Sequence, residues 1–263
     1  MRKLDVTRLP AAYRYMTELD PSGWAWEFLR RNPDYRADAA KLTAQPEAAR
    51  PTDGPRAVTG GCKVLEKPDR RGDEAVLFWR SELLVDLVRL VAAPAGTDSQ
   101  LRFDPLRWAG QLTTLATDEG LNLVLRLRGG TEYRLLLPGP DPPRDGSPLA
   151  IVIEPNRFWR SRVAAAERFL TLAARSRLPI RPRLSAFVPP EEVARRTYML
   201  WAIDLEQAAA SEHEIGAIVF GTRVSGAIWS NHADRSELRR LLRAGRSFVS
   251  GRYRELLQAR RLR

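Results

Sequence analysis

The sequence predicts an α+β fold, in which a small antiparallel sheet with helical cover is followed by an all-α carboxyl-terminal part. Three observations predict it. Strand-like segments in the middle of the chain are joined by short turns that contain glycine. Helix-capping residues gather near both ends of the chain. The last helix-like segment is amphipathic and rich in arginine.

The first part, residues 1–36, is rich in aromatic side chains. Asp20 can cap a helix that opens with proline, and Trp24 and Phe28 would share one face of it. Asn32-Pro33 ends this helix, because a residue before proline disfavours the helical region. The aromatic rings and the arginines between them are able to stack on bases. A short helix rarely folds alone, so we favour a helix that its aromatic residues hold onto the body or a partner.

The next two parts are a linker, residues 37–71, and an α+β body, residues 72–180. The linker is rich in proline, alanine, glycine and threonine, which predicts little regular structure. In the body, the sequence predicts strands over 75–79, 111–117, 121–128, 132–137 and 149–153. Asp118-Glu119-Gly120 and Gly129-Gly130 are expected hairpin turns. A helix over about 156–177 would cover the sheet with Val163, Ala166, Leu170 and Ala173 on one face.

The last part, residues 181–263, is predicted to be helical. Proline and acidic residues at 189–192 open a long helix that runs to about Ala210. Ser211 and Glu214 then have the spacing of a capping box, and a short helix follows that Gly221 ends.

The segment from Arg235 to Arg263 carries most of the excess positive charge. It holds ten arginines, no lysine and two acidic residues, so it supplies +8 of the formal net charge of +11. Charge this dense points to a polyanionic partner, most commonly nucleic acid. The alternative is a solvated basic tail in an arginine-rich proteome.

Periodicity separates these two readings. A helix over 234–249, capped by Asp234 or Ser236, would place its apolar residues on one side and its arginines on the other. Gly245 on the apolar side would let another helix approach closely, and Gly251 would end the segment. The apolar set is Leu238, Leu241, Leu242, Phe248 and Val249; the basic set is Arg235, Arg239, Arg240, Arg243 and Arg246.

The capped short helix and the arginine helix together predict a variant helix-turn-helix. The connection over 222–233 is longer than an ordinary turn, and Val224, Ile228 and Trp229 indicate that it packs down. An alternative register starts the third helix within 222–230. We rank it lower because it places Gly226 mid-helix and offers only Arg223 as a basic group.

Other function classes lack support. The sequence shows no catalytic constellation, phosphate-binding loop, cofactor motif or metal-ligand spacing, and its two histidines, His213 and His232, stand apart from other ligands. We therefore expect no enzyme, no metal and no cofactor. Cys62 is the only cysteine, and no run of apolar residues is long enough to span a bilayer. A cytoplasmic location without membrane contact is the expectation.

Both ends of the chain resemble a proteobacterial two-part regulator family. The stretch 24–36 resembles its short amino-terminal "transcriptional regulator domain". The stretches 211–221 and 236–257 resemble the domain of unknown function that is usually joined to it. Such proteins are similar to activators that switch on excision and transfer of integrative and conjugative elements. The resemblance implies a variant helix-turn-helix that binds promoter DNA. Related single domains act as antiactivators that bind the activator instead.

The sequence therefore predicts a DNA-binding transcriptional regulator, with an antiactivator or adaptor that acts without DNA as the alternative. Its partners would be double-stranded promoter DNA and an antiactivator protein or RNA polymerase. Arg239, Arg240 and Arg243 are expected at the groove, because arginine pairs bidentately with guanine. Phosphate contacts are expected from Arg235, Arg246, Arg252 and Arg254, assisted by backbone N–H groups at Ser211 and His213.

Overall fold

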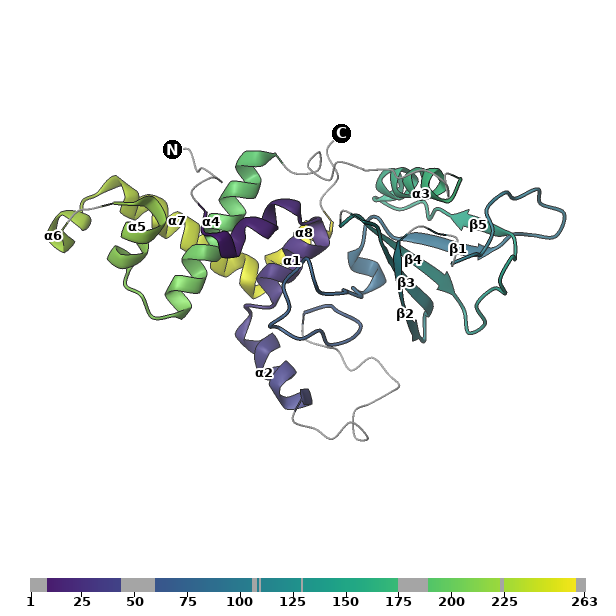
Figure 1. Ribbon diagram of the computed structural model, residues 1–263, viewed down its shortest axis with the longest axis horizontal. Coiled ribbons are helices and arrows are strands. Elements are labelled where there is room, and N and C mark those ends of the chain that lie inside the picture. Colours follow the sequence, from purple (N-terminus) through teal and green to yellow (C-terminus); the bar gives the residue numbers. More distant parts are fainter. Residues whose placement is uncertain are drawn as a thin grey trace.

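A helical unit and a five-stranded sheet lie next to each other along the long axis of the molecule (Figure 1). The computed structural model describes residues 9–43, 60–105, 108, 110–128, 130–174, 189–222 and 225–258. The predicted α+β class, with a carboxyl-terminal group of helices, is confirmed.

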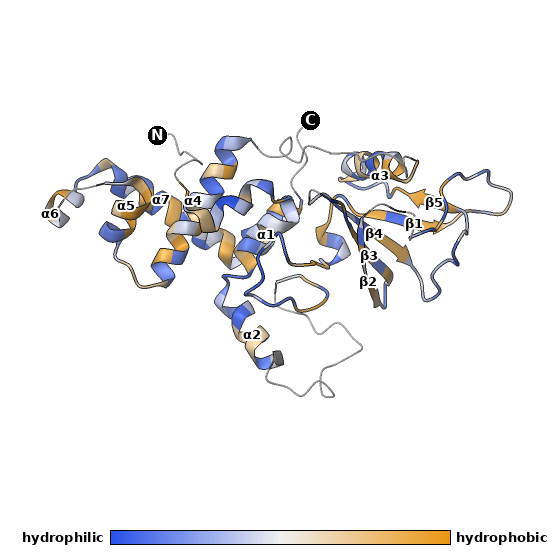
Figure 2. Cartoon of the chain, viewed as in Figure 1, coloured by the Kyte–Doolittle hydropathy of each residue, from blue (hydrophilic) through white to orange (hydrophobic). Residues whose placement is uncertain are grey.

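The sheet is mixed, with strand order β2-β3-β4-β1-β5. Its strands are β1 (Val88–Ala92), β2 (Gln111–Thr117), β3 (Gly120–Arg126), β4 (Glu132–Pro138) and β5 (Leu149–Val152). β2, β3 and β4 form an antiparallel meander, as the turn residues predict, while β1 pairs parallel with β4 and antiparallel with β5. Figure 2 shows much of these strands in orange, which marks the apolar residues that hold the sheet against its helical cover.

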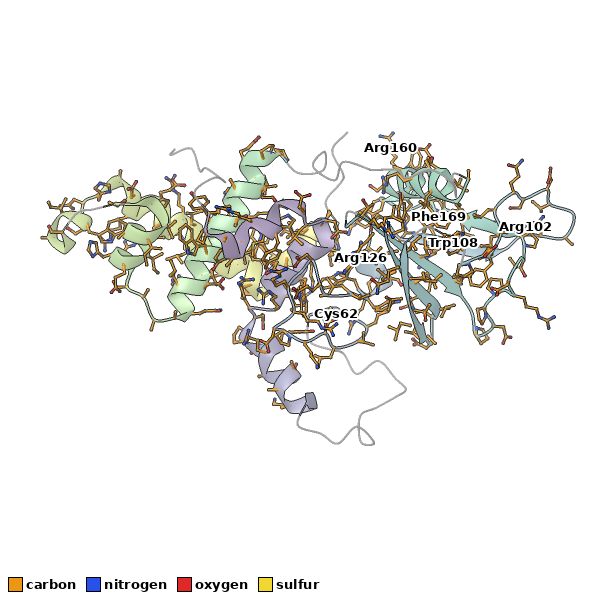
Figure 3. All side chains as sticks on the ribbon, in the orientation of Figure 1. Cys62, Arg102, Trp108, Arg126, Arg160 and Phe169 are labelled. Atoms are coloured by element: carbon orange, nitrogen blue, oxygen red, sulfur yellow. The ribbon has the colours of Figure 1, made fainter. Side chains whose placement is uncertain are left out.

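Helix α3 (Trp159–Ala174) covers this sheet. Trp108 and Phe169 meet edge to face in the core between them, with ring centroids 5.3 Å apart (Figure 3). The predicted face is correct in part: Ala166 is buried and Ala173 packs against the core. Leu170 was placed wrongly, since it is 44% exposed, whereas Ala165, Phe169 and Leu172 are buried. The bulky ring of Phe169 fills the space above the sheet and sets the rotation of the helix.

The segment predicted as a strand over 75–79 has a different role. Only Trp79 pairs, in an isolated bridge with Cys62. Ala75, Leu77 and Trp79 are buried in the core of the helical unit rather than in the sheet. A short apolar run is compatible both with a strand and with a loop that lines a core. Its composition alone could therefore not distinguish the two.

The amino-terminal segment forms a 3₁₀ helix η2 (Ala11–Glu18) and helices α1 (Pro21–Leu29) and α2 (Pro33–Thr43). Asp20 caps α1 as predicted, accepting from the Gly23 N–H at 2.7 Å. Helix α2 extends into the predicted linker, so the expectation of little regular structure there was wrong up to Thr43. The linker part that the structure does not describe lies over 44–59.

The carboxyl-terminal part contains α4 (Pro190–Gln207), α5 (Glu212–Phe220), α6 (Gly226–Trp229) and α7 (Ala233–Ser247). A π-turn, η6 (Phe248–Arg252), and α8 (Tyr253–Leu257) complete it. Gly251 sits at the kink between α7 and α8 with φ of 153°. This conformation is accessible to glycine, which explains why the segment turns there.

Both ends of the chain share one hydrophobic core. Phe28 of α1 stacks on Phe248 at a centroid distance of 4.8 Å, and Trp24 and Trp26 are fully buried. Asn32 Nδ2 donates to the Val249 carbonyl at 2.9 Å. Residues 9–43 and the helices α4 to α8 therefore form a single helical unit, and the sheet is inserted between them in the chain. This arrangement matches the packing interpretation of the aromatic segment.

A buried ion network fastens α1 to α4. Arg31 donates to Glu27 Oε2 and to Asp204 Oδ1, both at 2.6 Å, and Arg30 donates to the same Glu27 oxygen at 2.7 Å. Burial alone would raise the pKa of Glu27, but the charges of Arg31 and Arg30 outweigh it and hold that pKa below its ordinary value. Each charge in this network is paired, so removal of one partner would leave an uncompensated charge in the core.

A second buried network joins α1 to the sheet. Arg134 on β4 donates to Asp20 Oδ2 at 3.1 Å and also pairs with Glu132. Asp20 therefore caps α1 and receives the sheet arginine with the same carboxylate. The position of the sheet relative to the helical unit is fixed through the start of α1.

We expect Arg31→Met to destabilise the protein by about 3 kcal/mol, because it leaves Glu27 fully buried with one cation fewer. Urea unfolding followed by circular dichroism measures this. Arg36→Met is the matched control, since the Arg36 side chain is 52% exposed and faces an exposed Asp69; its change should stay within about 0.5 kcal/mol.

The pH dependence of this network has a defined sign. The pKa of Glu27 is lowered on folding, so its contribution is present above the unfolded pKa and is lost as the pH falls below about 4. Stability should drop less steeply with acid in Arg31→Met than in the wild type. Equal losses in Arg31→Met and Arg36→Met would contradict the role of this network.

Candidate nucleic-acid interface

Helix α7 has the two faces that its periodicity predicts. Leu238, Leu241 and Leu242 are at most 2% exposed and pack into the helical core, together with Phe248 and Val249 from η6. The cap was predicted wrongly: the His232 Nδ1 accepts from the Asp234 N–H at 3.2 Å, so the helix begins one residue earlier. Arg239, Arg240, Arg243 and Arg246 are exposed. One face therefore anchors the helix and the other presents guanidinium groups.

Gly245 brings α7 close to α4. A Cβ atom at this position would lie 2.8 Å from Ile203 Cγ1, which no ordinary packing permits. The predicted close approach is thus confirmed. It holds α7 rigidly against the longest helix of the unit.

Helix α5 begins with the predicted capping box. Glu214 N–H donates to Ser211 Oγ at 3.3 Å, and Ser211 N–H donates to Glu214 Oε2 at 2.8 Å. Gly221 ends the helix in the left-handed conformation, with φ of 68°. The Ser211 N–H, expected to assist a phosphate contact, is thus already bound by a carboxylate.

The long connection between α5 and α7 holds the one-turn helix α6. Its anchor is Trp229, which is 5% exposed and packs on Gly216 of α5. His213 and His232 flank the indole, with ring centroids 5.9 and 6.1 Å from it. His213 therefore packs on the connection and is not turned outward. The preferred register is confirmed, because the third long helix begins at Ala233; Arg223 and Val224 lie outside the described residues.

The outward side of α6 is exposed and uncharged. Ser225, Gly226 and Ala227 are exposed, and Ile228 is 58% exposed. In Figure 1, α6 lies at the end of the molecule that is farthest from the sheet. This tip and the adjoining α7 form the surface that is open to a large partner.

Carboxylates of neighbouring helices hold three of the α7 arginines. Glu212 of α5 accepts from Arg235 at 3.4 Å and from Arg239 at 3.1 Å. Glu206 of α4 accepts from Arg246 Nε at 3.0 Å. The hydrogen bond from Arg239 is the main reason why the pKa of Glu212 lies below its ordinary value. These pairs are exposed and are worth little in stability.

The other predicted arginines have different surroundings. Arg240 pairs with Glu237 on its own helix, and Arg252 pairs with Glu255 at 2.9 Å. Arg254 stacks over the Tyr253 ring at 5.0 Å, on α8, which packs against α1. Arg243 is exposed and makes no ion pair within the described part of the chain. The structure thus groups Arg235, Arg239, Arg240, Arg243 and Arg246 along α7 and sets Arg252 and Arg254 apart from them.

Sequence reasoning missed the partners of these arginines. Glu206 and Glu212 belong to earlier helices, and only the tertiary packing brings them to α7. The described residues also bring together no group of three His, Cys, Asp or Glu side chains that could hold a metal ion. Burial raises the pKa of the Cys62 thiol, which leaves it protonated and unreactive. Within the described ranges, no helix is long and apolar enough to cross a bilayer.

Comparison with protein families gives two matches. Residues 152–258 match a family model described as "T6SS, Transcription factor, DNA binding domain". Residues 7–59 match a model described as "Proteobacterial transcriptional regulator-like domain". A search of curated proteins found no significant match. The two family matches support a DNA-binding regulator, and the first of them contains the whole α5–α7 surface.

We expect Gly216→Ala to destabilise the protein by about 1–3 kcal/mol, because the added methyl group overlaps the Trp229 ring and displaces α6. Gly226→Ala is the matched control in α6 itself, where a Cβ atom meets nothing within 4 Å. That variant should lose no stability, because alanine has a higher helix propensity than glycine. Thermal unfolding of both variants measures the difference, and equal stability would contradict the anchoring role of Trp229.

Proposed function

We propose that this protein is a sequence-specific DNA-binding transcriptional regulator that places the outer face of α7 and the tip of α6 against duplex DNA. The observation that carries the proposal is the row of arginines on the face of α7 opposite its buried leucines. A rigid helix with one anchored and one cationic face is what the third helix of a helix-turn-helix supplies. The family match over the same residues supports this assignment.

The arginines divide by position. Arg239, Arg240 and Arg243 are proposed at the major groove, where guanidinium groups pair bidentately with guanine. Arg235 and Arg246, nearer the two ends of α7, are proposed on phosphates. Arg252 and Arg254, on the far side of the kink, would contact only the flanking backbone of a longer site. Neutralising about five phosphates gives a log–log salt slope near −4.5.

Two carboxylates beside α7, those of Glu206 and Glu212, reduce the positive potential of this surface and hold its arginine side chains in place. Glu212 and Glu206 keep three guanidinium groups in defined positions in the free protein. On DNA, phosphate or base oxygens take over the outward N–H groups, while the carboxylates repel nearby phosphates. The expected result is weaker non-specific binding, so that correct base contacts decide the affinity.

We further propose that the regulator is an activator of mobile-element excision and transfer genes. The support is the resemblance of both chain ends to regulators of this kind. A promoter–reporter assay with and without the protein tests the sign of regulation. Reduced transcription from the bound promoter would reject the activator role while leaving DNA binding intact.

The alternative is an antiactivator or adaptor that binds a protein partner through its aromatic amino-terminal segment and its α+β body, with the arginine helix on an acidic partner. The packing of α1 argues against the first of these surfaces, because Trp24, Trp26 and Phe28 are fully buried within the same chain. These side chains therefore offer no contact surface in the folded protein. A gel shift with random duplex at several salt concentrations separates the two functions.

We expect the double variant Arg239→Ala/Arg243→Ala to lose specific promoter binding by about 30-fold or more, because two groove contacts worth about 1–3 kcal/mol each are removed. Arg128→Ala/Arg144→Ala, with the same charge change on exposed residues of the sheet unit, is the control. Fluorescence anisotropy measures both. Unchanged affinity of the α7 variant would reject the assignment.

Glu212→Gln should bind random duplex about fivefold more tightly than the wild type, since it frees Arg235 and Arg239 from an exposed pair worth up to about 1 kcal/mol. The salt slope should become steeper at the same time. Glu167→Gln on the exposed side of α3 removes the same charge and should change neither quantity. Weaker binding by Glu212→Gln would show that the carboxylate supports the DNA-bound form.

A further inference from the structure

An open pocket of about 770 Å³, with charged side chains in its walls, lies between the sheet, the segment that leads into β1 and the segment that leads into α3. Its walls come from the 3₁₀ turn η4 (Ser81–Leu83), the strands β1 and β4, the turn before β3, and the residues that lead into α3. This volume falls within the usual range for small-molecule sites, which favour the joints between structural units. Half of the wall belongs to residues 60–151, which neither family model covers.

One wall is cationic. Arg89 on β1 donates to Glu154 at 3.2 Å, and Arg162 on α3 pairs with the other oxygen of the same carboxylate. Arg157 also lines the cavity, with its guanidinium over the Phe158 ring at 4.5 Å. Three guanidinium groups and one carboxylate thus line this wall, and two of the guanidinium groups contact that carboxylate, which leaves the wall with an excess of positive charge.

Arg89 and Arg162 each have an N–H donor that lacks an acceptor among the described residues. The Arg162 side chain is 8% exposed, and the Arg89 side chain is 28% exposed. The Nε–H groups of both are buried and meet no acceptor among the described residues. Buried donors of this kind ordinarily have partners. The Glu154 side chain, at 38% exposed, is the most exposed of the three, so a ligand that enters from solvent reaches it first.

The opposite wall carries two carboxylates. Glu119 accepts from Ser81 Oγ at 2.5 Å and from Lys63 Nζ at 3.1 Å, which compensates its charge. Glu82 also lines this side of the cavity and would repel a second anionic group there. A ligand with one anionic end and a neutral or amino end fits this distribution.

We propose that this cavity binds a small molecule that carries a carboxylate or phosphate group, with the oxyanion against Arg89 and Arg162 in place of Glu154. Arginine suits both groups, because its planar fork donates two parallel hydrogen bonds. The apolar side chains of Leu136, Pro138 and Phe158 line the space for the rest of the molecule.

The segment that lines the cavity also contacts the carboxyl-terminal helices, so a bound ligand could influence them. Leu84 and Leu87, just after η4, belong to the core of the helical unit. The Val85 N–H donates to the Leu257 carbonyl of α8 at 3.4 Å. A ligand that contacts Ser81 and Arg162 together would fasten the sheet to this segment, as an effector does.

Calorimetric titration of the purified full chain with inorganic phosphate and with acetate, at constant ionic strength, tests the proposal. We expect one of the two probes to bind the wild type. Arg162→Gln should weaken that binding about tenfold or more, and Glu154→Gln should strengthen it about tenfold by removing the competing carboxylate. Tighter binding of phosphate assigns a phosphorylated ligand, and tighter binding of acetate assigns a carboxylate.

Two control variants and one replacement for the test variant make the outcome decisive. Arg160→Gln changes an exposed arginine of the same helix, which points away from the sheet in Figure 3, and should leave binding unchanged. Arg89→Gln replaces Arg162→Gln if the latter fails to fold. Arg239→Ala/Arg243→Ala removes two exposed arginines of α7, which do not line the cavity, and should also leave binding unchanged. Equal binding by the wild type and both cavity arginine variants, or no binding of either probe to wild type and Glu154→Gln, overturns the proposal. No DNA is present, so the result is independent of the proposed function.

Discussion

Burial of the aromatic face of α1 against η6 and α8 is the constraint on which the rest of the structure depends. It joins the two ends of the chain in one core, with Phe28 stacked on Phe248 and Arg31 paired to Asp204. Because α7 leads directly into η6, this core also fixes the inner end of the arginine helix. The sheet is held at the same place through Arg134 and Asp20. The amino-terminal segment is thus a structural part of the carboxyl-terminal helices.

Most arginines on the exposed face of α7 are paired with carboxylates, which reduces the positive potential of this surface. The carboxylates that pair with it come from α4, α5 and α7 itself, so every turn of α7 except that of Arg243 has an acidic neighbour. Such pairs add little stability, but they order long side chains and reduce the attraction to arbitrary polyanions. In a DNA-binding protein, ordered arginine side chains and a weaker attraction to phosphates favour binding to particular base sequences over tight binding to any duplex.

Local patterns predicted more than long-range ones. The buried leucines of α7, the capping box at Ser211 and the close approach at Gly245 all follow from periodicity and backbone chemistry, and the structure has them. The strand expected over 75–79 was wrong because an apolar run does not say which core it enters. The carboxylate partners of the arginines could not be predicted, since helix packing alone brings Glu206 and Glu212 to α7. The DNA-binding roles of the individual residues remain predictions.

In the one-turn helix α6, one residue packs onto the body of the protein and the residues before it are exposed to solvent. Trp229 packs it onto the body, against Gly216 and two imidazole rings, while the preceding four residues face solvent. The exposed side chains before Trp229 make little packing contact, so substitutions there should change the folding energy little. If the tip of α6 contacts DNA as proposed, such substitutions would change the preferred sequence while the rest of the fold is kept.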